Sequence, residues 1–319
     1  MNLSPNPPAV IVTDLVHQYE GRPALKGISF QIEEGEFFGI LGPNGGGKST
    51  TFRILATLLT PTSGHATVCG YDVVKSRDAV RYHIGVAFQA PALDTKLTVH
   101  ENMMHHGHLY GLSGADLRRR IDESLSGIGL RDRSGDLVEK LSGGLRRRIE
   151  LAKALMSHPS VLILDEPTVG LDPRARDDFW KLVQDLRART GMTVLATTHL
   201  LEEGSACDRI AILDEGRIVA LDSPSVLCGQ IPGEIVTIHG RGIVDHADLI
   251  ARTLGVSVET QGDALRLNAD DGTQAAGRVR ELLGDAIDSI SIARPTLSDV
   301  FRQRTGHAFA SESQLSGVS

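Results

Sequence analysis

The stretch Glu36–Thr50 reads EFFGILGPNGGGKST, an apolar run that leads directly into a glycine-rich loop. The loop Gly42–Thr50 has the spacing Gly-x-x-x-x-Gly-Lys-Ser, which is typical of phosphate binding. A helical pattern of apolar residues follows it, so it is more than an ordinary glycine-rich turn. Glycine accepts a positive φ and has no side chain to block the approach of phosphate to the backbone. We therefore predict an α/β fold built around a phosphate-binding loop.

The residue types of this loop fit a nucleoside triphosphate. Lys48 supplies a positive charge for the β- and γ-phosphates, and Ser49 supplies a hydroxyl ligand for Mg²⁺. The helix that follows directs the positive end of its dipole toward the phosphates. The residues expected to bind ATP here are Gly42, Pro43, Asn44, Gly45, Gly46, Gly47, Lys48, Ser49 and Thr50.

The rest of the chain alternates strand-like runs with helical patterns, which indicates a layered α/β fold. The spacing of Phe52, Leu55, Leu58 and Leu59 predicts that the helix after the loop extends through Leu59. A strand is predicted at Ile84–Gln89, and residues 98–130 read as helical. Three later apolar runs read as buried parallel strands: Val161–Leu164, Val194–Thr197 and Arg209–Leu213.

The region Ser223–Glu234 contains two prolines and reads as a linker. The patterns beyond it follow the order strand, helix, strand, strand, helix, strand, which resembles a split-βαβ sandwich. We therefore expect a main domain at residues 9–230, with a helical subdomain at about 95–155, and a small α+β domain at residues 235–305. The serine-rich end, residues 306–319, is expected to be disordered.

A pair of acids ends the first of these three strands, where VLILDEP places Asp165 beside Glu166. Ligands of parallel sheets bind beyond the carboxyl ends of the strands. We expect Asp165 near Mg²⁺, and Glu166 where its carboxylate can polarise an attacking water. Two acids after a strand are a weak signal alone, since structural turns often end this way. Beside a phosphate-binding loop they become a strong one.

A second glycine pair lies in LSGGLRRRIELAKAL, residues 141–155. Apolar residues at helical spacing place Ser142, Gly143 and Gly144 at a helix N-terminus, where a hydroxyl, bare backbone and the helix dipole form a second anion site. The following arginines could be a nucleic-acid patch. We read them as a solvated, salt-bridged face, because Glu150 follows Arg146 by four residues.

Together these motifs resemble the ATP-binding-cassette (ABC) ATPase family over residues 9–230, since LSGG just upstream of VLILDEP separates that family from other phosphate-loop ATPases. The resemblance implies a cassette fold with a mixed sheet, helices and a helical subdomain, and hydrolysis of ATP with Mg²⁺. It also implies a head-to-tail pair of cassettes. Each ATP would then lie between the phosphate loop of one copy and Ser142–Gly144 of the other.

The resemblance assigns further roles. Tyr19 matches the aromatic residue that stacks on adenine, and Gln89 matches the glutamine that touches Mg²⁺ and the attacking water. His199 matches the histidine that contacts the γ-phosphate, and Gly170–Pro173 matches the loop that crosses the dimer interface. Outside this register, Tyr19 and His199 would read as packing residues. The implied catalytic residues are Lys48, Gln89, Glu166 and His199, and the implied metal ligands are Ser49, Gln89 and Asp165.

One position departs from the family. Leu145 stands where the family usually has glutamine, which weakens only claims about ribose or interface contacts from that position. An apolar residue before Arg146–Arg148 resembles the exporter branch related to daunorubicin-resistance and nodulation-factor ATPases. The stretch ARPTLSDVFRQRTG, Ala293–Gly306, resembles the end of that branch's accessory domain. This implies a separately encoded membrane permease and export of a drug, lipid or glycan.

Composition is compatible with that interpretation. The 319 residues carry a net charge of −7, which gives no reason to expect a nucleic-acid partner. Three scattered cysteines suggest a reducing cytoplasm without a zinc or disulfide framework. We find neither a signal peptide nor a stretch of the roughly 18–20 apolar residues that span a bilayer. We therefore expect a peripheral protein on the cytoplasmic face of the plasma membrane, held there by its permease.

Two other functions stay open from the sequence. A soluble ABC ATPase could act on ribosomes or DNA, but such proteins usually carry two cassettes or long coiled coils, and this chain has one phosphate loop and one LSGG. A regulatory cassette could bind ATP without turning it over. The presence of Lys48, Glu166 and His199 counts against that reading. The transported molecule is not identified, because substrate contacts would lie in the permease.

Overall fold

The computed structural model describes residues 7–309. These residues form two compact units, and the boundary between them along the chain lies between Leu221 and Asp222. The first unit contains a six-stranded sheet in the order β10-β9-β3-β8-β7-β6. Its strands are β3 (Phe37–Leu41), β6 (Ile84–Ala87), β7 (Val161–Asp165), β8 (Thr193–Thr198), β9 (Arg209–Asp214) and β10 (Arg217–Asp222). The pairs β3–β8, β3–β9, β6–β7 and β7–β8 are parallel, so their carboxyl ends meet at one edge. This edge carries the phosphate loop.

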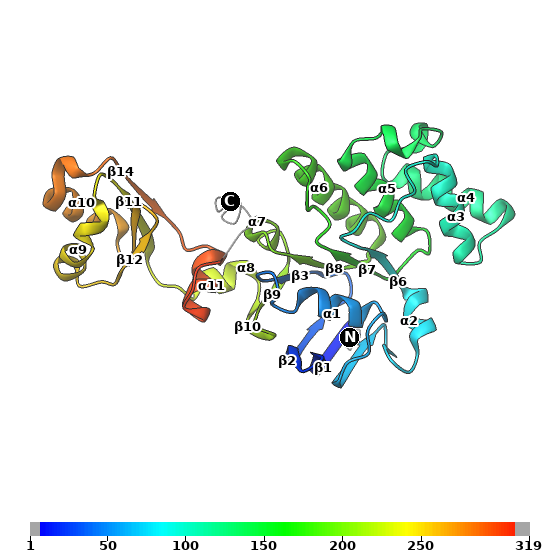
Figure 1. Ribbon diagram of the computed structural model, residues 1–319, viewed down its shortest axis with the longest axis horizontal. Helices are drawn as coiled ribbons and strands as arrows, with labels where there is room; N and C mark the ends of the chain where they lie inside the picture. The colour runs from blue at the N-terminus through cyan, green and yellow to red at the C-terminus, as the bar shows by residue number, and fades with distance from the viewer. Residues whose placement is uncertain (1–6, 310–319) are drawn as a thin grey trace, which may run out of the picture. The chain divides into compact units, whose positions relative to one another are not determined.

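A second, antiparallel sheet of the first unit has the order β2-β1-β4-β5. It comprises β1 (Val10–Tyr19), β2 (Arg22–Ile32), β4 (Ser63–Val68) and β5 (Tyr71–Asp72). β1 and β2 form a hairpin through Glu20 and Gly21, which both have positive φ, at 39° and 85°. Helix α1 (Lys48–Leu55) is labelled in Figure 1, and its side chains form one hydrophobic core with those of both sheets.

The prediction that the first helix extends through Leu59 is wrong. α1 ends at Leu55, because Thr57 adopts a left-handed φ of 62° and the N–H of Leu58 bonds back to the carbonyl of Arg53. Leu58 is consequently 55% exposed. Apolar spacing alone does not register a backbone reversal at a residue such as threonine.

Helices gather at one end of the first unit (Figure 1), as α3 (Val99–Leu109), α4 (Gly114–Gly127) and α5 (Gly143–Leu155). Thr98 and Glu101 cap the start of α3 reciprocally, and the predicted continuous helical region 98–130 breaks before α4. The sequence reading did not include β4, β5, α2 (Arg77–His83), α6 (Pro173–Thr190) or α7 (Leu201–Gly204). α6 does carry boundary signals, since Asp172 caps it, Pro173 opens it and Gly191 ends it at φ 70°.

The second unit has an antiparallel sheet in the order β12-β13-β11-β14. Its elements follow the predicted strand and helix order: β11 (Glu234–His239), α9 (Ala247–Leu254), β12 (Val258–Gln261), β13 (Ala264–Ala269), α10 (Gly272–Leu283) and β14 (Ser289–Ala293). Residues of α9 and α10 pack on one face of this sheet to form a separate core.

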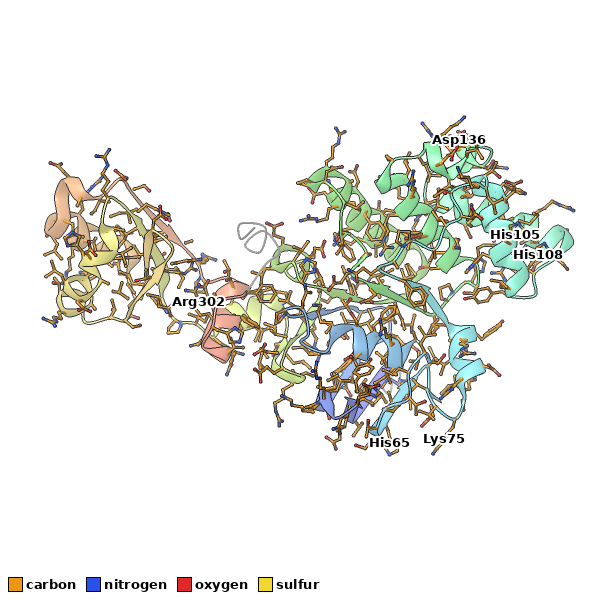
Figure 2. The ribbon with its side chains drawn as sticks, in the orientation of Figure 1. His65, Lys75, His105, His108, Asp136 and Arg302 are labelled. Atoms are coloured by element: carbon orange, nitrogen blue, oxygen red, sulfur yellow. The ribbon has the colours of Figure 1, made fainter. Side chains whose placement is uncertain are left out.

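Two more helices, α8 (Pro224–Gly229) and α11 (Leu297–Thr305), complete the second unit. Arg302, labelled in Figure 2, belongs to α11 and forms an ion pair with Glu259 of β12. Within the segment expected to be disordered, Phe309 is buried and its ring meets that of Phe301 edge-on at 4.8 Å. The remainder of that segment, residues 310–319, lies outside the described residues.

Candidate active site

The phosphate loop connects β3 to α1 through a turn that requires glycine. Gly47 has φ 110°, and a Cβ added there would lie 2.8 Å from Cδ2 of Leu25. A Cβ at Gly42 would lie 2.2 Å from the carbonyl oxygen of Leu213 on β9. The loop therefore packs directly against the backbone of β9 at Gly42, and at Gly47 it has a backbone conformation that residues with a side chain rarely adopt.

The ammonium group of Lys48 lies inside this loop, and the residue is only 4% exposed. Its Nζ donates to the carbonyl oxygens of Gly42 at 2.8 Å and Pro43 at 3.1 Å. It also lies 3.2 Å from Oε1 of Glu166. A lysine ammonium has three N–H groups, so these three contacts use its whole donor capacity.

Glu166 links the loop to His199. Its φ of 42° is left-handed, and its N–H donates to Oγ1 of Thr197 at 3.0 Å. Oε2 lies 3.1 Å from Nδ1 of His199 while Oε1 faces Lys48. Burial acts to raise the pKa of this carboxyl, but the hydrogen bond from His199 and the charge of Lys48 outweigh it and lower the pKa. Glu166 is therefore a carboxylate at neutral pH, which is the form that its predicted role as a base requires.

Asp165 lies beside Glu166 at the end of β7 and is buried. Its Oδ1 accepts a hydrogen bond from the hydroxyl of Thr197 at 2.6 Å. Burial raises the pKa of Asp165, and this hydrogen bond partly opposes the rise. Thr197 thus contacts both acids of the site, a role that the sequence reading did not include.

The predicted residues from four parts of the chain line one pocket of about 440 Å³. Tyr19 comes from the end of β1, Gln89 from the segment after β6, and Glu166 from the end of β7. The phosphate loop contributes Asn44, Gly45, Gly47, Lys48, Ser49 and Thr50. Gly42, Pro43 and Gly46 belong to the same loop, and Asp165 and His199 adjoin Glu166.

Ser142, Gly143 and Gly144 are not among the residues that line this pocket. Ser142 caps α5 by accepting a hydrogen bond from the N–H of Leu145 at 3.3 Å, as predicted for a helix N-terminus. Ser142 and Gly143 are exposed. This pocket and the capped N-terminus of α5 are therefore separate features of the chain.

The prediction of a solvated arginine face on α5 is wrong for Arg147. That residue is 8% exposed and pairs with the buried Glu150, three residues later. Arg146, the predicted partner of Glu150, instead donates to the carbonyls of Val138 at 3.1 Å and Glu139 at 2.8 Å. A charged residue was read as exposed because charged side chains are almost never fully buried unless paired.

The donors around the pocket suit a small hard cation. Ser49 offers a hydroxyl oxygen, Gln89 an amide oxygen and Asp165 a carboxylate, the oxygen ligands that Mg²⁺ prefers. Within residues 7–309, no cluster of three or more His, Cys, Asp or Glu side chains could hold a metal by itself. The oxygen set fits a metal that takes its remaining ligands from substrate phosphate and water.

Comparisons with known proteins agree with this geometry. The family model described as ABC transporter matches residues 25–169. The daunorubicin/doxorubicin resistance ATP-binding protein of Streptomyces peucetius is 38% identical over 315 residues, which cover 96% of this chain and 95% of the relative. The chain belongs to the ATP-binding proteins of ABC transporters. It therefore binds and hydrolyses ATP, and the predicted cassette fold is confirmed.

Two further matches place this ABC protein more closely. The Nod factor export ATP-binding protein I of Paraburkholderia xenovorans is 37% identical over 304 residues, covering 94% of this chain and 98% of the relative. A solved dimer of the ATP-binding cassette MJ0796, bound to ADP and Pi after hydrolysis, has a TM-score of 0.60 and 29% identity, covering 67% of this chain and 98% of that one. The predicted family and its exporter relatives are thus confirmed. ATPase domains of this family work as dimers with a separate membrane permease.

Proposed function

We propose that this ABC protein powers export of a drug, lipid or glycan by a separately encoded permease. The observation that supports hydrolysis is that the Glu166 carboxylate contacts both Lys48 of the phosphate loop and His199. The support for export comes from relatives named for drug resistance and Nod factor export, which match residues of both compact units. The proposed class of transported molecule is therefore as broad as the range of substrates for which these relatives are named.

ATP binding follows from the loop. Its backbone N–H groups and the N-terminus of α1 surround the phosphates, and Tyr19, 39% exposed at the end of β1, stacks on the adenine ring. Ser49, Gln89 and Asp165 would hold Mg²⁺, which when bound would supply positive charge beside the phosphates.

Hydrolysis uses a change of partner at Lys48. Because its three N–H groups are already engaged, a phosphate oxygen takes Lys48 only by displacing one of its contacts, and we infer that Glu166 is displaced. Loss of that positive neighbour raises the pKa of Glu166 and makes it a stronger base. Glu166 then orients the attacking water beside Gln89. Lys48 and His199 stabilise charge that develops on the γ-phosphate.

Two copies complete each site in this proposal. Exposed Ser142 and Gly143 at the start of α5 offer N–H groups and a hydroxyl to an anion, and they do not line the chain's own pocket. A head-to-tail pair brings them onto the γ-phosphate of the partner's ATP and excludes water. The loop at Gly170–Pro173 crosses that interface.

The proposed location is the cytoplasmic face of the plasma membrane. Across residues 7–309, no helix combines the length and apolar character needed to cross a bilayer. Attachment in this proposal is therefore through the permease.

The test is the Glu166→Gln variant, which keeps the side chain's shape and removes its basicity. We expect turnover to fall by at least about 100-fold while ATP binding persists and an ATP-dependent dimer accumulates, as measured by light scattering. Glu202→Gln, at an exposed glutamate on α7, is the matched control and should retain activity. Undiminished hydrolysis by Glu166→Gln would refute the assignment of the base.

A further inference from the structure

Helix α5 buries an ion pair that the catalytic mechanism above does not use. Arg147 is 8% exposed and Glu150 is 7% exposed, and their side chains are in contact. The neighbouring arginine of the run differs, since Arg148 is partly exposed and lies 3.7 Å from Asp178 on α6. A buried ion pair carries a desolvation cost that hydrogen bonds to further groups must offset.

The further groups of Arg147 are three backbone carbonyls. Nη1 donates to the carbonyl of Phe88 at 2.6 Å, directly before Gln89. Nη2 reaches the carbonyl of Asp165 at 3.4 Å, and Nε donates to that of Pro167. The last two carbonyls flank Glu166. One guanidinium therefore holds the residues on either side of the proposed base and the residue before the proposed metal ligand.

Glu150 extends these contacts along the same segment. Its Oε1 accepts a hydrogen bond from the N–H of Ala92 at 2.7 Å. Lys153, one turn further along α5, donates to the carbonyl of Ala92 at 2.6 Å. Helix α5 thus grips both ends of residues 88–92, which contain Gln89.

We propose that Arg147 and Glu150 are a positioning pair, through which α5, the helix capped by Ser142, holds Gln89 and Glu166 in fixed register. This inference rests on the proposed function, which assigns those two residues their roles. The planar guanidinium has five N–H donors in a rigid fork, so it bridges carbonyls on two segments at once. The pair thus links the N-terminus of α5, where the proposed function places the partner's ATP, to the segments that carry Gln89 and Glu166.

The Arg147→Lys variant tests the pair, because it retains the positive charge beside Glu150 but cannot bridge both segments. We expect kcat to fall between about 10- and 100-fold, the cost typical of a misplaced catalytic group. The KM for ATP should stay within about threefold, because the phosphate loop and Tyr19 are untouched. Arg148→Lys in the same run is the matched control, with kcat expected within about twofold of wild type.

A merely structural role gives a different result. The melting temperature of Arg147→Lys would fall while kcat per folded molecule stayed within about twofold of wild type, and that outcome would overturn the proposal. Should this variant fail to fold, the double variant Arg147→Gln with Glu150→Gln carries the test, because it removes both buried charges and keeps hydrogen-bonding groups. The same selective loss of kcat is expected there.

The Glu166→Gln variant separates this inference from the proposed function. If Glu166→Gln abolishes turnover and Arg147→Lys matches wild type, the assignment of the base stands and the positioning pair is refuted. If Glu166→Gln retains full turnover, the proposed function fails at its base, whatever Arg147→Lys does.

Discussion

Replacing Thr197 by valine removes one buried hydroxyl without changing the shape of the side chain. Thr197 is fully buried, donates to Asp165 at 2.6 Å, and accepts from the N–H of Glu166 at 3.0 Å. A hydrogen bond to a charged group contributes about 1.5–3 kcal/mol, and one between neutral groups contributes about 0.5–1.5 kcal/mol. The N–H of Glu166 keeps a second acceptor, the carbonyl of Thr197 at 3.2 Å. We therefore expect Thr197→Val to lower the free energy of unfolding by about 2–4 kcal/mol.

The same variant should change the pH dependence of hydrolysis. The Thr197 hydrogen bond lowers the pKa of Asp165 against the effect of burial, so its removal raises that pKa further. Since the proposed role of Asp165 as an Mg²⁺ ligand requires its ionised form, the acidic limb of the ATPase profile should move to higher pH.

Thr193→Val, on the same strand, is the control for Thr197→Val. Thr193 is also buried, but its hydroxyl accepts from the N–H of Gly35 at 2.9 Å, and Thr193 does not line the pocket. We expect a loss of about 1 kcal/mol there with an unchanged pH profile. Urea unfolding and steady-state ATPase assays between pH 5 and pH 9 measure both quantities. Identical pH profiles for Thr197→Val and wild type would refute the reasoning about Asp165.

Three further predictions test the loop, the base and the aromatic pair. Gly42→Ala should abolish ATP binding or folding, because its Cβ would lie 2.2 Å from a backbone oxygen. A Cβ at Gly45 meets open space, so Gly45→Ala should lower the free energy of unfolding by only about 1–2 kcal/mol. Thermal melts with and without ATP compare the two variants. Because the pKa of Glu166 is lower in the folded protein, its ionised carboxylate stabilises the fold above the pKa of an ordinary glutamate, and this stability is lost as pH falls through the folded pKa. Wild type should therefore lose its stability advantage over Glu166→Gln on acidification. A stability difference that stays constant with pH would contradict the lowered pKa. Within the described part of the chain, neither buried ring nitrogen of His17 has a hydrogen-bond partner, and the ring meets that of Tyr19 edge-on at 4.5 Å. His17→Phe should therefore raise the free energy of unfolding by about 1 kcal/mol, as measured by urea titration. ATP affinity should stay unchanged.

Much of the fold could be predicted because its signals are local. Continuous apolar runs identified β7, β8 and β9, and the strand and helix order of the second unit followed from alternating patterns. Short elements without such patterns were missed, including β5 with two residues and α7 with four. α6 was not predicted although Asp172 and Gly191 mark its ends, because Asp172 and Pro173 also belong to the motif Gly170–Pro173.

The site divides in the same way. Lys48, Glu166 and Tyr19 were identified by motif and register, and the pocket brings all three together. Thr197 and Arg147 carry no motif of their own, because their importance comes from contacts across the sheet. Periodicity assigns a residue to a helix face, but it does not show which backbone groups pack against that face. A buried arginine is predictable only when unpaired carbonyls opposite it are known, and those belong to loops distant in sequence.

Arg147 shows why such contacts also resist substitution. Its guanidinium donates to three backbone carbonyls and one carboxylate together. Truncating the side chain leaves the buried charge of Glu150 without Arg147 and removes the hydrogen bonds to the carbonyls, whereas neutralising both partners leaves only weaker hydrogen bonds to be remade. The two kinds of variant should therefore differ more in stability than in catalysis, because both release the segments around Gln89 and Glu166 from α5.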